Sequence, residues 1–256
     1  MTDFPAPPPP PPDHLMPPPG YVPYGGFGLG QGSFQPIRSL TKWLVILLGV
    51  TLVVQTAALL VQLTLRGSAS DFLDGSINSG TFDDKLGTYL AIALLAAAVG
   101  VGQLVVLILW TFRMAKNMGV LGRQPQTFKP GLTIAVNILG GCTLGILNFF
   151  MWRELWIGSD PETAPGDPVW KRRPLGGIVV AHLVLTLVSV AVGFAVGIGA
   201  GIAGFNQSNS TDVAENLTDK FGVVLASGAL QIALGVVFIM LVRQLAARHM
   251  QSTREA

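Results

Sequence analysis

The fourth long apolar stretch of this chain carries a row of polar and small side chains. Their spacing of three and four residues places them on one face of a helix. From the polar part to the glycine part, the row is His182, Thr186, Ser189, Gly193, Gly197 and Gly201. One interpretation is a helix-packing seam, whose glycines could also form a homo-oligomer contact. The alternative is a path for a small neutral solute, along which His182 changes its protonation. Gln55, Gln103 or Gln231 would give His182 a hydrogen-bond partner.

A second polar group flanks the ends of the second and third apolar stretches. Its members are Arg113, Asn117, Arg153, Glu154 and Trp156. All are expected at the boundary between the membrane and the cytoplasm. An Arg–Glu pair there would anchor the middle stretch against the loop after the second helix. The same basic side chains could instead bind anionic lipid headgroups or a protein partner, and catalysis is the third role open to them.

The chain lacks the motifs of common catalytic and cofactor sites. It has no Gly-rich phosphate loop, no His-Glu-x-x-His, no Gly-x-Ser-x-Gly and no Cys/His metal spacing. Cys142 is the only cysteine, and the three histidines are scattered. The long apolar stretches hold no charged residue, which argues against a proton-coupled carrier, a voltage sensor or a charged ion filter. We therefore expect no enzyme activity, no cofactor, no metal and no nucleic-acid partner.

Five long apolar stretches must position these residues. They cover residues 43–65, 89–110, 131–152, 175–204 and 221–242, and all 16 basic and 14 acidic residues lie outside them. Only 12% of the chain is charged, against about 25% in ordinary globular domains. Uncharged stretches of about twenty residues are typical of membrane-spanning helices. The sequence predicts an all-α, polytopic membrane helix bundle.

The distribution of Lys and Arg predicts how the chain crosses the bilayer. These residues stay mostly on the cytoplasmic side. If all five stretches cross, they divide 7 against 9; if the middle stretch does not cross, they divide 13 against 3. We therefore predict four transmembrane helices, at about 43–65, 89–112, 175–204 and 221–245, in the plasma membrane, with both termini cytoplasmic.

The middle stretch, 131–152, is then expected to be a re-entrant or interfacial helical hairpin. Gly140 and Gly141 at its centre allow the chain to reverse. A re-entrant hairpin exposes backbone groups at membrane depth, so it must be buried in protein or line a wet cavity. A fifth crossing that breaks the positive-inside rule and a helix pair lying on the membrane surface are the alternatives.

The two ends of the chain differ from the bundle in composition. Residues 1–40 contain proline runs at 7–12 and 17–19 and few aliphatic residues, which predicts a disordered, Pro/Gly-rich cytoplasmic tail. This tail is either a solvated tether or a docking peptide for a proline-reading domain. The bundle is expected over residues 41–247, and a short basic cytoplasmic tail over 248–256.

All five tryptophans fall near the predicted cytoplasmic boundary. They are Trp43, Trp110, Trp152, Trp156 and Trp170. Because tryptophan is enriched at membrane–water interfaces, we expect a cytoplasmic face that is both basic and rich in tryptophan.

A set of motifs runs from the end of the second apolar stretch into the loop after the third. It consists of Trp110-x-x-Arg113-x-Ala115-x-Asn117, Pro130, Arg153-Glu154-Leu155-Trp156, Ser159, Pro161 and Trp170. With these motifs the chain resembles, over roughly residues 88–245, a family of actinobacterial membrane proteins labelled domain of unknown function 4328. The resemblance implies a bacterial plasma-membrane protein without implying an activity. The family usually has prolines in the middle stretch, where this chain has Gly140-Gly141.

Two functions remain open at this point. The first is a non-enzymatic scaffold or interaction module, which presents its cytoplasmic face to anionic lipids or to a cytoplasmic or membrane protein partner. The second is a channel or transporter for a small neutral solute along the face of His182, Thr186 and Ser189.

Overall fold

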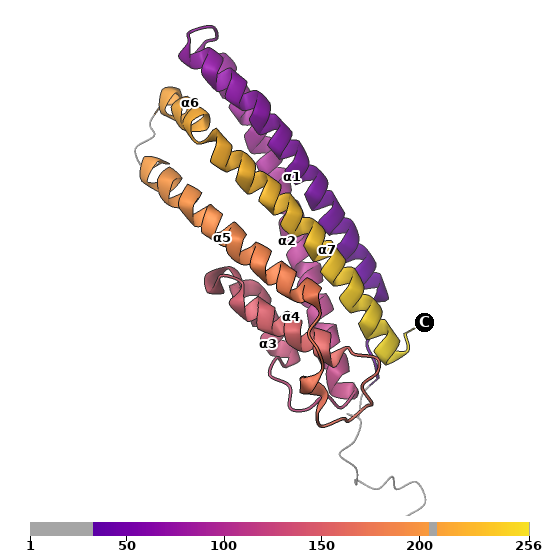
Figure 1. The fold of residues 1–256 in the computed structure, drawn as a ribbon. Coiled ribbons are helices and arrows are strands. Elements are labelled where there is room, and N and C mark those ends of the chain that lie inside the picture. Colours follow the sequence, from indigo (N-terminus) through magenta and orange to yellow (C-terminus); the bar gives the residue numbers. More distant parts are fainter. Residues whose placement is uncertain (1–32, 205–208, 256) are drawn as a thin grey trace, which may run out of the picture.

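The computed structural model describes residues 33–204 and 209–255, with side chains described outside 195–204. Residues 1–32 of the predicted tail lie outside this description. Four long helices dominate the described chain: α1 (Arg38–Leu73), α2 (Ser79–Val120), α5 (Gly177–Gly204) and α7 (Phe221–Thr253). Each is long and apolar enough to span a membrane. They run side by side as a bundle (Figure 1), which confirms the predicted all-α polytopic fold.

The middle stretch folds into two short helices that double back. α3 (Pro130–Leu139) and α4 (Ile146–Gly158) have 10 and 13 residues and are joined by the 3-10 turn η2 (Gly141–Thr143). At 1.5 Å per residue they measure about 15 and 20 Å, short of the roughly 30 Å hydrocarbon core. The predicted hairpin is therefore confirmed as a fold. We call this end of the bundle the hairpin end; the opposite end carries α6 (Ser210–Asp219).

The reversal lies a few residues later than the glycine pair that predicted it. Gly140 keeps helical angles, whereas Leu144 and Gly145 are left-handed, with φ of 53° and 79°. Gly145 is also crowded, because a Cβ there would lie 2.7 Å from Cγ2 of Thr186 on α5. Glycine is required at position 140 because a Cβ there would collide with the Asn148 side chain, and not because of its backbone angles.

Tryptophans build the core at the hairpin end instead of facing outward. Trp110, Trp152, Trp156 and Trp170 are at most 7% exposed, and only Trp43 is open, at 60%. The rings of Trp110 and Trp152 lie 6.2 Å apart. The expectation of a tryptophan-rich face is therefore wrong, because the hairpin and the loop after it fold over these rings and remove them from the surface.

The helices continue past the predicted apolar stretches at the opposite end. α1 runs to Leu73 and α2 starts at Ser79, so α1 measures about 54 Å. A small apolar cluster of Leu65, Ala69, Phe82 and Ala214 holds this extension together. Ala214 belongs to α6, which sequence reading left as part of a loop. Burial of these apolar side chains stabilises helix beyond the length that a bilayer requires.

The close helix contacts mediated by glycine differ from the predicted seam. On α7, a Cβ at Gly228 or Gly235 would meet leucine side chains of α1 at 2.6 and 2.7 Å. On α5, a Cβ at Gly193 would find nothing within 4 Å. Gly197 and Gly201 belong to the part of α5 whose side chains are not described. Within the description, close glycine contacts join α7 to α1 and, at Gly158, α4 to Met118 of α2, whereas the predicted α5 seam is not engaged at Gly193.

The C-terminal segment, expected to be a separate tail from 248, is ordered. α7 continues to Thr253, and Glu255 follows it. The Glu255 carboxylate accepts hydrogen bonds from the backbone N–H groups of Ile37 and Arg38, at 3.0 and 2.9 Å. A carboxylate at a helix N-terminus satisfies free N–H groups and opposes the helix dipole. The end of the chain therefore caps the start of α1.

Candidate functional site

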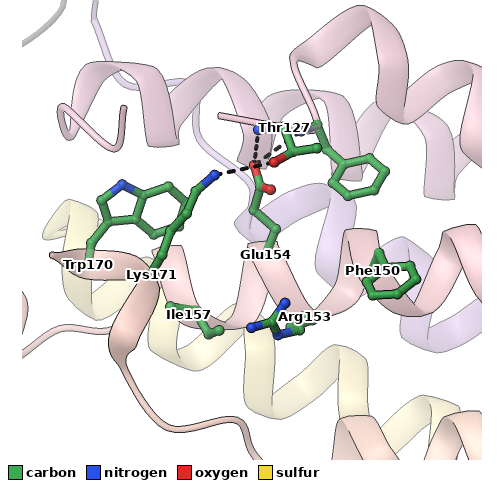
Figure 2. A pocket seen from close by; sticks show the side chains of 8 residues that line it. Thr127, Phe150, Arg153, Glu154, Ile157, Trp170 and Lys171 are labelled. Carbon is green, nitrogen blue, oxygen red and sulfur yellow. Dashed lines mark hydrogen bonds between the residues drawn. The ribbon is translucent and has the colours of Figure 1, made fainter. Parts of the chain in front are cut away.

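A pocket of about 280 Å³ opens at the hairpin end (Figure 2). It lies between the loop after α2, helix α4 and the 3-10 turn η3 (Trp170–Arg172). We call it the hairpin-end pocket. Its lining combines aromatic and aliphatic side chains with two bases and one acid: Thr127, Phe128, Phe150, Arg153, Glu154, Ile157, Trp170 and Lys171.

Glu154 joins α4 to the loop after α2. Its Oε1 accepts hydrogen bonds from the backbone N–H groups of Thr127, at 2.8 Å, and Phe128, at 3.1 Å. The side chain is 9% exposed. Sequence reading expected this connection but assigned it to an Arg–Glu pair. Within the described chain the anchor is made by backbone donors instead, and Arg113 and Arg153 form no ion pair.

The two basic side chains of the pocket remain open. Arg153 and Lys171 are both exposed. In Figure 2 the Lys171 side chain extends toward Thr127. The Lys171 ammonium donates to Thr127 Oγ1 at 3.2 Å and lies 5.3 Å from the centre of the Trp170 ring. Phe150, 44% exposed, borders the pocket near Arg153. The pocket thus offers positive charge beside an apolar surface.

Arg113 and Asn117 hold the segment that leads into α1. Arg113 Nη1 donates to the carbonyl oxygen of Pro36 at 2.8 Å. The Asn117 side chain accepts from the N–H of Gln35 at 2.7 Å and donates to its carbonyl at 2.8 Å. Neither residue lines the hairpin-end pocket. The structure therefore divides the predicted group: Arg153 and Glu154 belong to the pocket, and these two fasten the start of the bundle.

Trp156, the fifth member of the predicted group, is buried. It is 7% exposed, and a Cβ at Gly176 would overlap its ring. The Arg248 guanidinium lies over the ring at 4.7 Å. The prediction that Trp156 belongs to an exposed interaction surface is therefore wrong. The side chain packs between α4, α7 and the start of α5.

A buried hydrogen-bonded row crosses the hairpin end. Asn117 Nδ2 lies 3.1 Å from His249 Nε2, and His249 Nδ1 lies 2.8 Å from Ser159 Oγ. Because the amide nitrogen donates, Nε2 accepts, and the neutral ring donates from Nδ1 to the serine. Ser, His and Asn also occur in nucleophilic sites. Here all three are at most 1% exposed, and none lines the hairpin-end pocket. The row ties α2, α7 and the end of α4 together.

Arg123 organises the loop after α4. It is fully buried and donates to the carbonyls of Gly158 at 3.2 Å and Thr163 at 2.8 Å, and also to Ala164. It therefore satisfies the Gly158 carbonyl at the end of α4, where helices leave acceptors free, and two carbonyls of the loop that follows. Burial lowers the pKa of Arg123, and the nearby carboxylates of Asp167 and Asp160 oppose that shift.

Asp160 binds side chains both within this loop and on α7. It accepts from Thr163 Oγ1 at 2.8 Å and pairs with Arg248 at 3.0 Å and Arg173 at 3.6 Å. Sequence reading did not single out Arg123, Asp160 or His249 as site residues, and Ser159 entered only through the family resemblance. One local signal indicated that His249 is buried. Val242, Leu245 and His249 follow one another at spacings of three and four residues, which places the three side chains on one buried face of α7.

The polar row of α5 faces the interior of the bundle. The His182 ring lies 5.1 Å from that of Phe238, and Ser189 is 6% exposed. Thr186 Oγ1 bonds back to the carbonyl of His182 at 2.8 Å. Of the proposed partners, Gln103 accepts from Thr51 Oγ1 at 2.9 Å. Gln55, Gln103 and Gln231 share a cavity lining with His182.

By length and composition of its helices, the chain has the architecture of a multi-pass membrane protein. Comparison with protein-family models, curated protein sequences and solved structures gave no match. The resemblance to the domain of unknown function 4328 family therefore stays a prediction.

Proposed function

We propose that this chain is a non-enzymatic scaffold of the plasma membrane whose hairpin end faces the cytoplasm and binds the headgroup of an anionic phospholipid. The observation that carries this proposal is the hairpin-end pocket, where Arg153 and Lys171 are exposed beside an apolar floor. Phospholipids join a phosphate to apolar chains, so a pocket with both kinds of surface matches them.

The charge of the whole hairpin end supports this orientation and ligand. Thirteen of the sixteen Lys and Arg residues belong to this end, and three belong to the opposite end. Basic residues accumulate on the cytoplasmic side of membrane proteins, and the cytoplasmic leaflet carries anionic lipids that attract them.

The pocket chemistry favours a phosphate over a cation. Glu154 is its one acid, and Oε1 of that side chain already accepts two backbone N–H bonds. The side chains open to an arriving group are therefore the bases. The Arg153 guanidinium can donate two parallel hydrogen bonds to a phosphate, and the Lys171 ammonium adds a point charge. Phe150 and Ile157 supply apolar contact for the glycerol and the first methylenes of the lipid.

Lipid binding to the full-length protein tests the proposal. Native mass spectrometry of the detergent-solubilised protein would compare phosphatidylglycerol with phosphatidylcholine. We expect a preference for phosphatidylglycerol that falls about thirtyfold in Arg153→Gln/Lys171→Gln, since each of the two bases near an anionic surface contributes about 1 kcal/mol.

The matched control removes one Arg and one Lys elsewhere at the same end. Arg243 and Lys116 are exposed and lie outside the pocket. Arg243→Gln/Lys116→Gln should keep the preference. Equal loss in the control, or no preference in the unaltered protein, would contradict a specific headgroup site.

A further inference from the structure

Two cavities inside the bundle meet at one pair of side chains. The first, of about 300 Å³, lies between the hairpin, α5 and α7, and we call it the hairpin cavity. The second, of about 170 Å³, lies between α1, α2 and α7, and we call it the glutamine cavity. His182 and Phe238 line both cavities. The pair therefore separates two neighbouring cavities, each lined by polar and apolar side chains.

The polar side chains of these cavities come from six different helices. They hold amide, hydroxyl and imidazole groups, and none of the described lining residues is Asp, Glu, Lys or Arg. This composition disfavours an ion, which would be held without a counter-charge in an apolar surrounding. The polar lining consists of Thr51, Gln55, Gln103, Asn137, Asn148, His182, Thr186 and Gln231.

Three carbonyl oxygens in the lining lack a partner. They are Oε1 of Gln55 and Oδ1 of Asn137 and Asn148, all buried. The orientation of Asn137 is well determined, because its Nδ2 donates to Thr111 Oγ1 and to the Thr133 carbonyl, both at 2.8 Å. Its oxygen must therefore be the free group. A buried acceptor without a donor costs about 1–3 kcal/mol, and at membrane depth bulk water does not relieve that cost.

We propose that each of the two cavities binds a small uncharged solute molecule that donates hydrogen bonds, such as a primary amide or a short polyol. Donors of a molecule in the hairpin cavity meet the free oxygens of Asn137 and Asn148, and a donor of a molecule in the glutamine cavity meets that of Gln55. The volumes of about 300 and 170 Å³ lie at and below the lower limit of known ligand pockets, so each cavity takes a small solute. These sites are separate from the hairpin-end pocket and do not depend on lipid binding there.

Saturation-transfer NMR on the full-length protein in phosphatidylcholine nanodiscs tests both sites, with acetamide and glycerol as probes. Such spectra detect weak binding by signals from the probe itself. We expect a saturable signal for at least one probe, above that of empty nanodiscs. Asn148→Leu and Gln55→Met each remove an acceptor from one cavity at nearly constant volume, and the double variant should weaken apparent affinity at least fivefold.

Two controls separate loss of the sites from loss of the fold. Thr56 is exposed on α1 and its hydroxyl bonds only to its own helix, so Thr56→Val should leave the signal unchanged. The unfolding temperature of each variant, measured with and without probe, identifies a variant that fails to fold. Signals no stronger than those of empty nanodiscs for both probes would overturn the proposal and leave cavities that hold water only. An unchanged signal in the folded Asn148→Leu/Gln55→Met double variant would overturn it as well.

Discussion

At the scale of single residues, the hairpin end depends on polar side chains that satisfy backbone groups. Glu154, Arg123 and Glu255 each bond to backbone atoms of a segment distant in sequence. Such bonds contribute little when formed, but removing one partner leaves a buried group unsatisfied. The cost of a substitution therefore depends on what it leaves behind.

Arg123→Met tests this point. The change keeps the apolar stem but leaves the carbonyls of Gly158, Thr163 and Ala164 without their donor. We expect the free energy of unfolding to fall by about 3 kcal/mol, the cost typical of breaking a buried charged network. Thermal unfolding in detergent, followed by tryptophan fluorescence, should show a lower midpoint.

Arg172→Met is the matched control, because Arg172 is an exposed arginine at the same end of the bundle. It should unfold at nearly the midpoint of the unaltered protein. If the two variants unfold at the same temperature, Arg123 contributes no more to stability than a surface residue.

At the scale of elements, the hairpin is defined by its reversal and by its contact with α5. α3 and α4 are too short to cross a bilayer, and the left-handed residues Leu144 and Gly145 turn one into the other. The turn lies against Thr186 of α5, so the hairpin tip and the polar row are placed together.

Gly145→Ala should destabilise the hairpin for two reasons. Alanine is strained at φ 79°, and its Cβ would lie 2.7 Å from Thr186 Cγ2. We expect a loss of about 2 kcal/mol in the free energy of unfolding, measured as a lower midpoint of thermal unfolding.

Two further variants separate these causes. Gly141→Ala meets nothing within 4 Å and should cost much less. Adding Thr186→Ser to Gly145→Ala removes the crowding methyl and should restore part of the loss, leaving the backbone strain. Full stability in Gly145→Ala alone would show that the turn adapts to a side chain.

At the scale of the whole molecule, the two ends of the bundle differ in their charged residues. The hairpin end holds most of the bases, whereas the opposite end carries acids on α1, α2 and α6. With four crossings, this asymmetry predicts that the hairpin end lies in the cytoplasm.

Thiol accessibility in intact cells tests that orientation. In a Cys142→Ser background, single cysteines would replace Glu162 at the hairpin end and Ser76 at the opposite end, both exposed. A membrane-impermeant maleimide should label Ser76→Cys only. After permeabilisation both should label, which controls for reactivity. Labelling of Glu162→Cys in intact cells would place the hairpin end outside and remove the basis for binding cytoplasmic-leaflet lipids.

Much of the fold follows from local properties of the sequence. Long uncharged stretches predicted four helices, and the distribution of bases predicted that the middle stretch doubles back. The same reasoning missed α6 and the continuation of α1 to Leu73, because helix beyond the bilayer is stabilised by packing between distant segments. It also wrongly predicted that the tryptophans covered by the hairpin are exposed, because local composition does not show which segment packs over a side chain.

The sequence by itself determined the class of the molecule, because helix length, apolarity and charge are properties of consecutive residues. Only the tertiary structure decided which polar groups meet. Asn117 finds His249 across 132 positions, and Glu255 reaches Ile37 across 218. The free oxygens of Asn137 and Gln55 likewise came to light only once their neighbours were in place. Pairings of this kind depend on how helices pack against one another, and no local pattern encodes them.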